Sequence, residues 1–517
     1  MMPQVATPQN MTPLTVHRAS HMLDKARWAV GVYGGFSLAD VLRITEAAAD
    51  ALADKAAYFA EAAVAETGYG VVEHKTLKNR LCSRGIFDHY RGHDYCAYRI
   101  DPATKIVEIA KPAGVIFALT PSTNPVCTVA FKIILALLTR NAIVVSPHPA
   151  AKRCCAEAAL VMNQAAMAAG APDGVIQIIE EPTPEIIDAL MRSPKTDVIL
   201  ATGGTAMVRA AYGSGNPALG VGPGNCPAYV AADADLARAA KVITESKAFD
   251  NSVLCTNESA IIADAAIADA LARELRRQGC HICSDEERRL VEDALFPLGK
   301  FNIGMIGQSA TSIAKECGFR VPPKTRVLVV PLERIGDDYP LSREKMCPVL
   351  GLYVAPSPES ALSACRAMVR RSGGGHSAAI HSRDAETILR FGAAVNVLRV
   401  VANGPCSTGA AGFDTHLAPT MTIGTGFLGR SSVAGNLQPS HLVQWTKIAF
   451  DKDDNVDFPA FDGLSVGEAR PLGESGIVSS GIVSSDAAQR SPEQPAPDDM
   501  TAEIRRIVVE ELSQWKR

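Results

Sequence analysis

Cys255 is the first residue of this sequence whose type and setting suggest chemistry. It lies in the segment SKAFDNSVLCTNESAIIA (Ser246–Ala263), between an apolar stretch and a polar one, where a loop could present it at the mouth of a site. A thiol attacks well only as its thiolate, and Cys255 has no cationic neighbour in the sequence, so activation would have to come from the fold. Taken alone, Cys255 reads more readily as a small buried apolar residue, because the chain has thirteen cysteines.

A second pattern with chemical meaning is ATGGTAMV (Ala201–Val208), which predicts a strand, a Gly-Gly turn and the start of a helix. Such a turn can direct backbone N–H groups and the positive end of a helix dipole at a pyrophosphate. The segment is not a GxGxxG motif, so by itself it is weak evidence for a dinucleotide site.

A CxxC pair, Cys280 and Cys283, stands before the acidic helix start SDEE. The chain offers no second pair with matching spacing, and structural zinc sites need four ligands. We interpret both cysteines as packing residues and expect no metal site.

The elements that must position these residues follow from an alternation of short β-branched runs with Ala-rich helical runs. This alternation predicts βαβ units, and therefore an α/β fold with a parallel sheet and helices on both faces. The chain is expected to open with helices over about 38–65. The next strands are expected at Val115–Leu119, Ala142–Ser146, Gly174–Ile179 and Asp197–Ala201, with helices near Thr128–Thr139, Ala151–Ala169 and Thr183–Arg192. A second alternating block, from about Ala228 to Phe427, predicts another α/β domain.

Composition bounds the class of protein. A chain of 517 residues with 47% apolar and 21% charged residues can bury two or three domain cores. Its net charge of −4 and scattered basic residues disfavour nucleic acid as a partner. Thirteen cysteines without regular spacing suggest reduced thiols in a cytosol. The start MMPQVATPQNMTPLTVHRAS has no apolar signal region, and Val126–Leu138 is too short to cross a bilayer, so we expect neither secretion nor membrane insertion.

The end of the chain changes character past Lys452. Ser, Gly, Pro and Asp dominate residues 463–499, which include the tandem GIVSSGIVSS, and this composition predicts a disordered linker. Residues 500–517 recover helical spacing, with apolar side chains on one face at Ile504, Ile507, Val508, Leu512 and Trp515. We predict an amphipathic docking helix there, the alternative being that it packs back on its own catalytic body or on a neighbouring subunit.

Seven segments, in this order, resemble the aldehyde dehydrogenase superfamily and specifically its CoA-acylating branch. They are PAGVIFALTPSTNP (112–125), RNAIVVSPHPAAK (140–152), ATGGTAMV (201–208), GVGPGNCPAYV (220–230), FDNSVLC (249–255), EKMCPVLGLY (344–353) and GGGHSAAIHS (373–382). Each segment is weak evidence alone, but their shared order is specific. The resemblance covers about residues 47–450.

The resemblance implies roles for individual residues. Cys255 stands where the family keeps its nucleophile, and Asn124 matches the oxyanion Asn, which would act with the backbone N–H of Cys255. Asn124 could instead simply form the turn before Pro125. The cofactor-binding residues implied are Thr120, Pro121, Ser146, His148, Thr202, Gly203, Gly204 and Glu344, with Glu344 on the nicotinamide ribose. His376 resembles a histidine of the acylating branch and is as readily a structural residue.

Two departures from the family pattern matter. Val221, 34 residues before Cys255, occupies the position of the Glu that activates water in hydrolytic members, and a valine cannot accept a proton. The acyl-enzyme would then wait for another thiol, which in the acylating branch is coenzyme A. Ser146 replaces the Lys that usually binds the adenosine ribose, which leaves NAD or NADP open, with NAD favoured.

The resemblance implies an aldehyde dehydrogenase-like architecture. We expect a disordered start (1–20), a nucleotide-binding domain (21–229) with an oligomerisation hairpin at about 95–110, a catalytic domain (230–430), and a return with an oligomerisation strand (431–462). The implied protein is a dimer or tetramer that oxidises a short aldehyde, and residues 500–517 resemble the encapsulation peptides of bacterial microcompartments, with shell or core proteins as partners. A hydrolytic dehydrogenase and a non-catalytic scaffold remain the alternatives.

Overall fold

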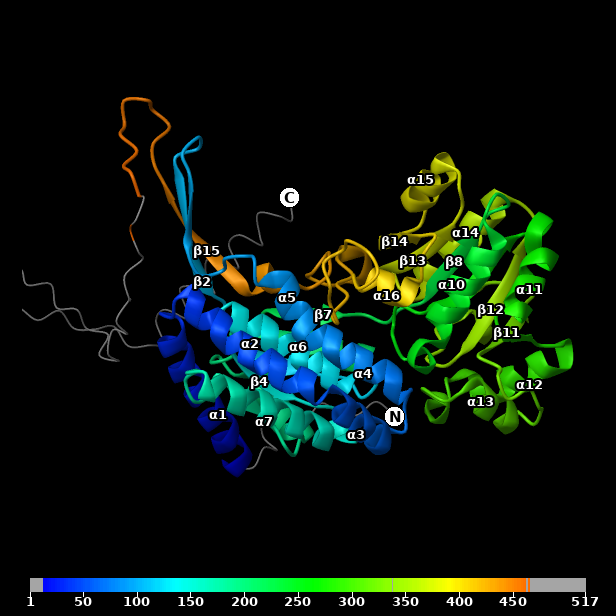
Figure 1. The fold of residues 1–517 in the computed structure, drawn as a ribbon, viewed down its shortest axis with the longest axis horizontal. Coiled ribbons are helices and arrows are strands. Elements are labelled where there is room, and N and C mark those ends of the chain that lie inside the picture. The colour runs from blue at the N-terminus through cyan, green and yellow to red at the C-terminus, as the bar shows by residue number, and fades with distance from the viewer. Residues whose placement is uncertain (1–12, 337, 462–463, 465–517) are drawn as a thin grey trace, which may run out of the picture. The chain divides into compact units, whose positions relative to one another are not determined.

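The computed structural model describes residues 13–336, 338–461 and 464, all within the first of two compact units, Met1–Ala469 (Figure 1). The predicted linker at 463–499 and the predicted C-terminal helix lie outside the described residues, except for Leu464. Among the helices that the structure describes, none is both long enough and apolar enough to cross a bilayer.

The first sheet has five parallel strands in the order β5-β4-β3-β6-β7. Their bounds are β3 Val115–Leu119, β4 Ala142–Ser146, β5 Ile176–Ile178, β6 Val198–Thr202 and β7 Ala218–Val221. Every residue of β3 and β4 is buried, which explains why both strands are uninterrupted apolar runs in the sequence. Parallel strands need crossover connections, and the Ala-rich segments between them supply helices, as the sequence predicts.

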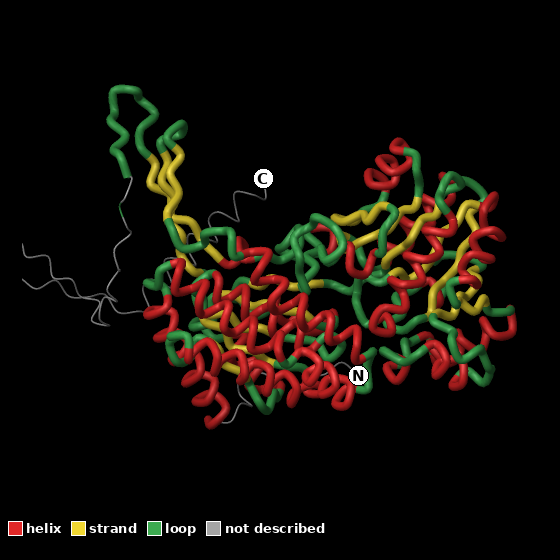
Figure 2. Tube along the Cα trace, in the orientation of Figure 1, coloured by secondary structure: helices red, strands yellow, loops and turns green. Residues whose placement is uncertain are grey.

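Helices pack around the first sheet (Figures 1 and 2). They are α1 Pro13–Tyr33, α2 Leu38–Asp54, α3 Ala56–Thr67, α4 Val72–Arg80, α5 Ile86–Tyr90, α6 Pro125–Leu138, α7 Lys152–Ala168, α8 Pro184–Arg192 and α9 Thr205–Tyr212, with a π-helical turn at Leu81–Gly85. Every residue of α6 is buried, and Pro125 occupies its first turn, where the missing N–H costs nothing. Thus α6 is the central helix of this core.

The expected disordered start through residue 20 is wrong from Pro13 onward, because α1 begins there. The sequence did not reveal this helix because its apolar residues are spread around it rather than gathered on one face. Leu23, Ala26 and Ala29 are fully buried against the first core, so a helix rich in small residues is held by packing rather than by a strong apolar stripe.

The second sheet has seven parallel strands in the order β10-β11-β12-β9-β8-β13-β14. Its strands are β8 Cys226–Val230, β9 Glu258–Asp264, β10 Cys280–Ile282, β11 Val327–Leu332, β12 Val349–Ala355, β13 Gly375–His381 and β14 Val397–Ala402. Its helices are α10 Leu236–Ala248, α11 Ala268–Arg277, α12 Asp285–Leu295, α13 Ala310–Glu316, α14 Pro358–Arg371, α15 Ala385–Ala394 and α16 Cys406–Ala410. Separate apolar cores lie on its two faces.

Both expected borders of the catalytic domain shift. Strand β8 already pairs with β9 and β13, so the second sheet begins at Cys226 rather than at residue 230. The return to the first core starts earlier than residue 431, because Met421 is buried in that core together with Leu437. Sequence alternation does not reveal which sheet a strand joins, so these borders required the structure.

A third, antiparallel sheet of order β1-β2-β15 stands apart from the other two (Figures 1 and 2). Its strands are β1 Tyr98–Asp101, β2 Ile106–Pro112 and β15 Val443–Ala449. Trp445 on β15 lies opposite Ala110 on β2. The guanidinium of Arg99 lies 3.9 Å from the centre of the Trp445 ring. The oligomerisation role expected for these strands stays a prediction.

Candidate active site

A cavity of about 360 Å³ brings together residues from both α/β sheets. Its lining includes every residue expected in catalysis or cofactor binding except His376: Cys255, Asn124, Thr120, Pro121, Ser146, His148, Thr202, Gly203, Gly204 and Glu344. In the sequence these residues are scattered from Thr120 to Glu344. The fold therefore makes one site from the scattered motifs.

The side of the cavity where the sequence predicts a cofactor lies at the carboxyl ends of β3, β4 and β6. Thr120 follows β3, Ser146 ends β4 and Thr202 ends β6. The chain runs from β3 through β4 to β5 on one side of the sheet and then crosses to β6 on the other. Nucleotides bind open parallel sheets at such a reversal of strand order.

Two buried hydroxyls in this part of the cavity have no hydrogen-bond partner among the described residues. They are Oγ1 of Thr120 and Oγ of Ser146, at 4% and 1% exposure. Gly204 begins α9 without a capping side chain, so the first N–H groups of this helix remain available. Unpaired donors and acceptors beside a helix N-terminus fit the ribose and phosphate groups of a dinucleotide.

The loop that carries Cys255, the predicted nucleophile, has an unusual backbone, and we call it the nucleophile loop. Asp250, Asn251 and Ser252 follow α10 and all have left-handed backbone angles, with φ of 49°, 49° and 64°. Left-handed conformations cost free energy for residues other than glycine and persist where the surroundings impose them. This turn directs the chain so that Val253, Leu254 and Cys255 line the cavity.

Burial raises the pKa of the Cys255 thiol to about 12, and the nearby Glu344 carboxyl adds to the effect, while Arg399 opposes it. The sequence predicts that any activation of this thiol must come from the fold, and the surroundings of Cys255 instead favour its neutral form. Cys255 rests here as a neutral thiol, and attack on a carbonyl requires that its proton be removed as substrate binds.

Asn124 lies at the start of α6, next to the nucleophile loop. Its side-chain amide donates to the carbonyl oxygen of Val253 at 2.9 Å, and its side-chain oxygen accepts from Nζ of Lys78 at 2.5 Å. It also begins the helix, because the N–H of Thr128 bonds to its carbonyl oxygen. The position of Asn124 is thus compatible both with a role as oxyanion donor and with a role in forming the turn before Pro125.

A buried ion cluster that sequence reasoning missed holds this region. Asp250 accepts from both Lys75 and Lys78, and all three side chains are buried. The positive charges of Lys78 and Lys75 lower the pKa of Asp250 in spite of its burial. Burial lowers the pKa of Lys75. The sequence held one hint of this cluster: an acidic residue, Asp250, in FDNSVLC, and two lysines three residues apart on one helix, Lys75 and Lys78. The cluster ties α4 to the nucleophile loop.

Glu344 faces the cavity beside Cys255. Burial raises its pKa to about 8, while Lys247 and a hydrogen bond from the backbone N–H of Gly224 oppose the shift. A Cβ at Gly224 would overlap the carbonyl oxygen of Cys255 and lie 3.4 Å from Oε1 of Glu344. Gly224 therefore permits the close approach of the nucleophile loop and the Glu344 carboxyl.

His376 lies on β13, fully buried, and is not part of the cavity lining. Its Nδ1 is 2.8 Å from Oγ of Ser377, and the backbone carbonyl of His376 accepts from Arg399 at 2.7 Å. Burial, with a smaller effect of Arg399, lowers the pKa of His376 to about 3, so the ring is neutral. The structure thus separates His376 from the ten residues that share the cavity.

Val221 ends β7 and belongs to a small apolar cluster with Ala411 and Ile423, against which Cys255 and Phe413 pack. The position expected to hold the water-activating carboxylate is therefore an apolar wall. Glu344 is the one carboxylate among the described residues that line the cavity.

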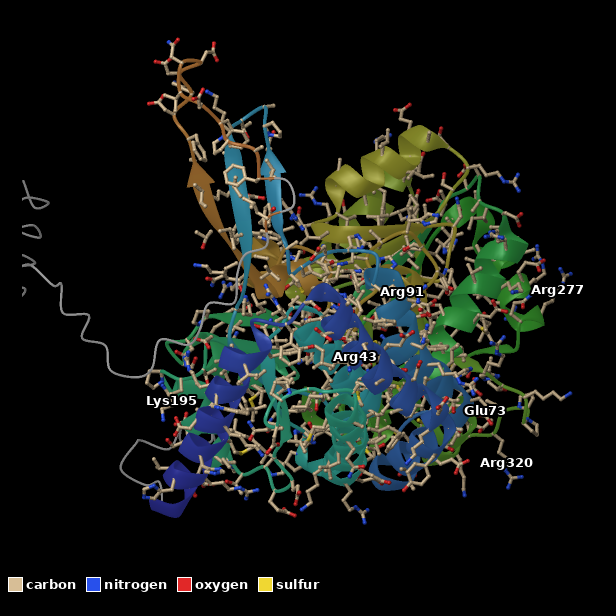
Figure 3. The ribbon with its side chains drawn as sticks, turned by 60° about the vertical axis from the view of Figure 1, so that its left-hand side comes forward. Arg43, Glu73, Arg91, Lys195, Arg277 and Arg320 are labelled. Atoms are coloured by element: carbon tan, nitrogen blue, oxygen red, sulfur yellow. The ribbon has the colours of Figure 1, made fainter. Side chains whose placement is uncertain are left out.

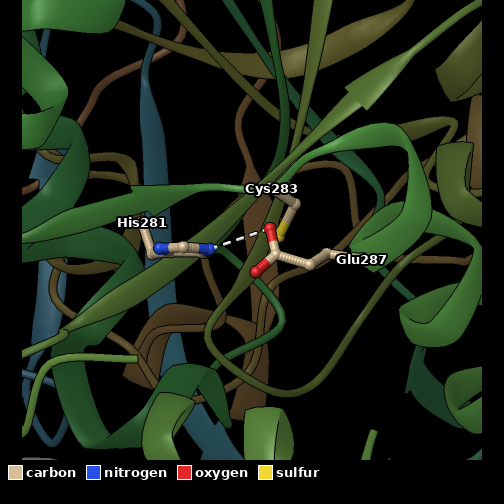
Figure 4. A group of neighbouring side chains, drawn as sticks. All are labelled: His281, Cys283 and Glu287. Carbon is tan, nitrogen blue, oxygen red and sulfur yellow. Dashed lines mark hydrogen bonds and ion pairs between the residues drawn. The ribbon is translucent and has the colours of Figure 1, made fainter. Parts of the chain in front are cut away.

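The CxxC cysteines face different cores. Cys280 belongs to the core on one face of the second sheet and Cys283 to the core on the other. Cys283 lies near His281 and Glu287, with the three ligand atoms within 4.8 Å of one another (Figure 4). Oε2 of Glu287 already accepts from the backbone N–H of Ser284 at 2.7 Å and lies 3.0 Å from Nε2 of His281. The capping box at the start of α12, which Glu287 completes, explains why this carboxylate lies here.

Comparison with known proteins agrees with this geometry. The family model described as "Aldehyde dehydrogenase family" matches residues 5–282. The chain is 36% identical over 445 residues to the bifunctional aldehyde-alcohol dehydrogenase AdhE of Escherichia coli K12, covering 85% of this chain but 50% of that one. It is 36% identical to the succinate-semialdehyde dehydrogenase (acetylating) of Clostridium kluyveri, covering 84% and 96% of the two chains. The chain belongs to the aldehyde dehydrogenase family.

Solved structures show the same fold. An acetylating aldehyde dehydrogenase from Geobacillus thermoglucosidasius superposes with a TM-score of 0.83 at 35% identity, covering 85% of this chain and 97% of that chain. A propionaldehyde dehydrogenase from the Clostridium phytofermentans fucose utilisation microcompartment gives a TM-score of 0.75 at 28% identity, covering 84% and 97%. The chain spans about half the length of AdhE, so the bifunctional activity in that name is not carried over.

Proposed function

We propose that this protein is a CoA-acylating aldehyde dehydrogenase that forms a thioester on Cys255 and transfers the acyl group to coenzyme A. The observation that carries the proposal is the wall beside the nucleophile. Cys255 packs against Val221, Ala411 and Ile423, where a hydrolytic member needs a carboxylate to activate water. The names of the C. kluyveri and G. thermoglucosidasius proteins, both acetylating enzymes, support the assignment.

In this proposal Cys255 attacks the aldehyde carbon, and the amide of Asn124 stabilises the oxyanion. The amide donates to the carbonyl of Val253 in the free enzyme, two residues from the nucleophile, so a small rotation would direct it to the substrate. A preorganised donor of this kind contributes about 3–4 kcal/mol of transition-state stabilisation.

The cofactor proposed is NAD, with NADP as the alternative. Thr120, Ser146 and the N-terminus of α9 at Gly204 would bind its phosphate and ribose groups, and Glu344 the nicotinamide ribose. When bound, the nicotinamide supplies a hydride acceptor. A protonated Glu344, which its raised pKa favours near neutral pH, can still donate to a ribose hydroxyl.

The alternative reaction, hydrolysis of the thioester to a free acid, would need a general base, and Glu344 is the candidate. A carboxyl with a pKa of about 8 beside Cys255 has the proton affinity of a general base, so it could activate water and give a free acid. Substituting Glu344 by Gln separates the two possibilities. If Glu344 binds ribose, Glu344→Gln raises the KM for NAD and leaves the acid yield low; if it is the base, acid formation falls while NAD binding is unchanged.

The aldehyde proposed is short and uncharged. Beyond Cys255 the cavity is lined by Met346, Met421, Ile423 and Ala411, and no described lysine or arginine lines it. A carboxylate or sulfonate on the substrate would be left without a cation, which is costly in a buried site. We expect a C2–C4 aliphatic aldehyde.

The experiment is to measure NADH formation from acetaldehyde, propionaldehyde, butyraldehyde and succinic semialdehyde, each with and without CoA. We expect turnover that requires CoA and prefers an uncharged aldehyde, with acyl-CoA as the product. Equal rates without CoA, with free acid as the product, would instead establish the hydrolytic reaction. No turnover with any aldehyde would favour the non-catalytic scaffold.

We further propose that residues 500–517 direct the enzyme into a bacterial microcompartment. Support comes from the amphipathic spacing from Ile504 to Trp515 in the sequence and from the microcompartment named for the C. phytofermentans protein. Fusing residues 500–517 to a fluorescent protein in a host that makes such compartments tests this. Docking requires punctate fluorescence; a diffuse fusion, or loss of turnover in the truncated enzyme, would contradict it.

We propose a homodimer or tetramer assembled through the sheet of β1, β2 and β15. The support is its position apart from both cores and the exposure of Ile448 on β15, at 41%. Light scattering on the wild type and on an Ile448→Asp variant tests this: the variant should dissociate into smaller species, and an unchanged mass would exclude the face.

A further inference from the structure

The imidazole of His74 lies on α4 against the turn that precedes Cys255. Its Nδ1 accepts a hydrogen bond from the backbone N–H of Asp250 at 2.9 Å. Its ring also packs on the ring of Phe249, with the ring centres 4.7 Å apart and an angle of 31° between the planes. His74 and Lys78 are four residues apart on α4, so they share one face of this helix. Because Lys78 pairs with the carboxylate of Asp250, this face holds both the backbone and the side chain of that residue.

The turn that His74 contacts has a strained backbone. Residues 250–252 all have left-handed backbone angles. In residues other than glycine such angles persist only where the surroundings impose them. Several contacts hold the Asp250 carboxylate, among them the bond of 2.7 Å from the N–H of Val71 to Oδ1. The bond to His74 instead acts on the backbone itself, at the first of the left-handed residues.

This bond fixes the protonation state of His74. A backbone N–H can only donate, so Nδ1 must carry a lone pair and the ring must be neutral, with its proton on Nε2. Burial lowers the pKa of His74, which favours this neutral form, although the Asp250 carboxylate opposes the shift. Of the other charges near the ring, Lys78 and Arg326 also lower this pKa, and Glu73, at the exposed surface of α4 (Figure 3), raises it. A protonated ring would turn an N–H toward the N–H of Asp250, and the bond would be lost.

We propose, on the basis of the proposed role of Cys255 as the nucleophile, that His74 is a positioning residue whose neutral imidazole holds the nucleophile loop in the geometry for attack. The same loop also positions the proposed oxyanion donor, because the carbonyl oxygen of Val253 accepts from the amide of Asn124 at 2.9 Å. A displacement of about 1 Å at a reacting atom can lower turnover by about a hundredfold. Loss of the His74 bond should therefore lower kcat, while the KM values change little.

Two substitutions separate the hydrogen bond from the rest of the side chain. Asn places its side-chain oxygen close to the position of Nδ1 and accepts without titrating, whereas Leu fills the space and accepts nothing. With propionaldehyde, NAD and CoA at about pH 7.5, we expect His74→Leu to lower kcat by about tenfold and to leave each KM within about twofold. His74→Asn should keep kcat within about twofold of the wild type. His441→Leu is the matched control, because Nδ1 of His441 also accepts from a backbone N–H, that of Gln438 at 3.1 Å, and His441 does not line the catalytic cavity.

The pH dependence gives a readout that a purely structural role would not change. As the pH falls from about 8 to about 5, the ratio of kcat for His74→Asn to kcat for the wild type should rise, because only the wild type loses the bond by protonation. Taking this ratio cancels the titration of Cys255, which both enzymes share. The midpoint of the rise should lie below about pH 6.5, since burial lowers the pKa of His74. This comparison remains decisive if His74→Leu does not fold.

A ratio that does not change with pH would overturn the proposal, and so would wild-type kcat in His74→Leu or an equal loss of kcat in both variants. The burst of NADH formed without CoA separates this result from the proposed function, because it reports only attack and hydride transfer. If the burst rate follows the predicted pattern but turnover does not need CoA, the proposed function fails and the positioning role stands. CoA-dependent turnover with a ratio that does not change with pH gives the reverse.

Discussion

Nζ of Lys78 lies 2.5 Å from the side-chain oxygen of Asn124, and this contact fixes which way the Asn124 amide points. A lysine ammonium can only donate, so the oxygen of Asn124 must face Lys78 and the NH₂ group must face the nucleophile loop. The same ammonium bonds to Asp250 in the strained turn before Cys255. Lys78 is therefore placed to align Asn124, the proposed oxyanion donor, with Cys255, the proposed nucleophile.

We accordingly predict that Lys78→Met lowers kcat by about tenfold to a hundredfold, the range expected for a displaced oxyanion donor. Lys75→Met is the matched control, because Lys75 also pairs with Asp250 but bonds to the carbonyl of Thr123 rather than to Asn124. Both variants should lose similar stability, since each removes one of two cations from a buried carboxylate. Steady-state kinetics and thermal unfolding check this; equal kcat in both variants would refute the positioning role.

The second prediction concerns the nucleophile. Cys255→Ala should abolish dehydrogenase turnover while NAD binding, measured by calorimetry, stays within about twofold, because the loss removes only the attacking atom. Cys96→Ala is the control, since Cys96 is the other partly exposed cysteine among the described residues. Retention of even a tenth of wild-type turnover by Cys255→Ala would mean that a different residue attacks.

The third prediction concerns the apolar wall. Val221→Glu should increase the rate of free-acid formation by about tenfold or more, because it places a base beside the thioester. Val221→Gln is the control, since it has the same size and polarity but cannot take up a proton. Burial of either side chain will cost stability, so both rates should be compared at a temperature where both variants are folded. Equal acid formation in the two variants would show that a base at this position is not what is missing.

The fourth prediction concerns pH. Because the pKa of Cys255 is raised to about 12, its thiolate fraction, and hence its rate of alkylation by iodoacetamide, should rise tenfold per pH unit from pH 7 to 10 without a plateau. Glu344 helps to raise this pKa only when it is ionised, and its own pKa is raised to about 8, so Glu344→Gln should speed alkylation at pH 9–10 and change it little at pH 7. Mass spectrometry of the Cys255 peptide measures both. A plateau near pH 8 in the wild type would contradict the structure.

The sequence predicted the strands, the α/β class and the residues of the cavity because these depend on local patterns. Continuous apolar runs such as Val115–Leu119 mark buried parallel strands, and the order of the motifs identified the family. The Lys78–Asp250 contact could not be predicted, because it joins residues 172 positions apart and depends on how two domains meet.

The measurement that tests the account most directly is the fate of the acyl group on Cys255. The enzyme would be mixed with NAD and excess propionaldehyde without CoA, freed of small molecules, and examined by intact-protein and peptide mass spectrometry over time. We predict an acyl adduct on Cys255 that persists in buffer and disappears on addition of CoA, with propionyl-CoA appearing in equal amount. An adduct that hydrolyses equally fast without CoA, or that never forms on Cys255, would contradict the account.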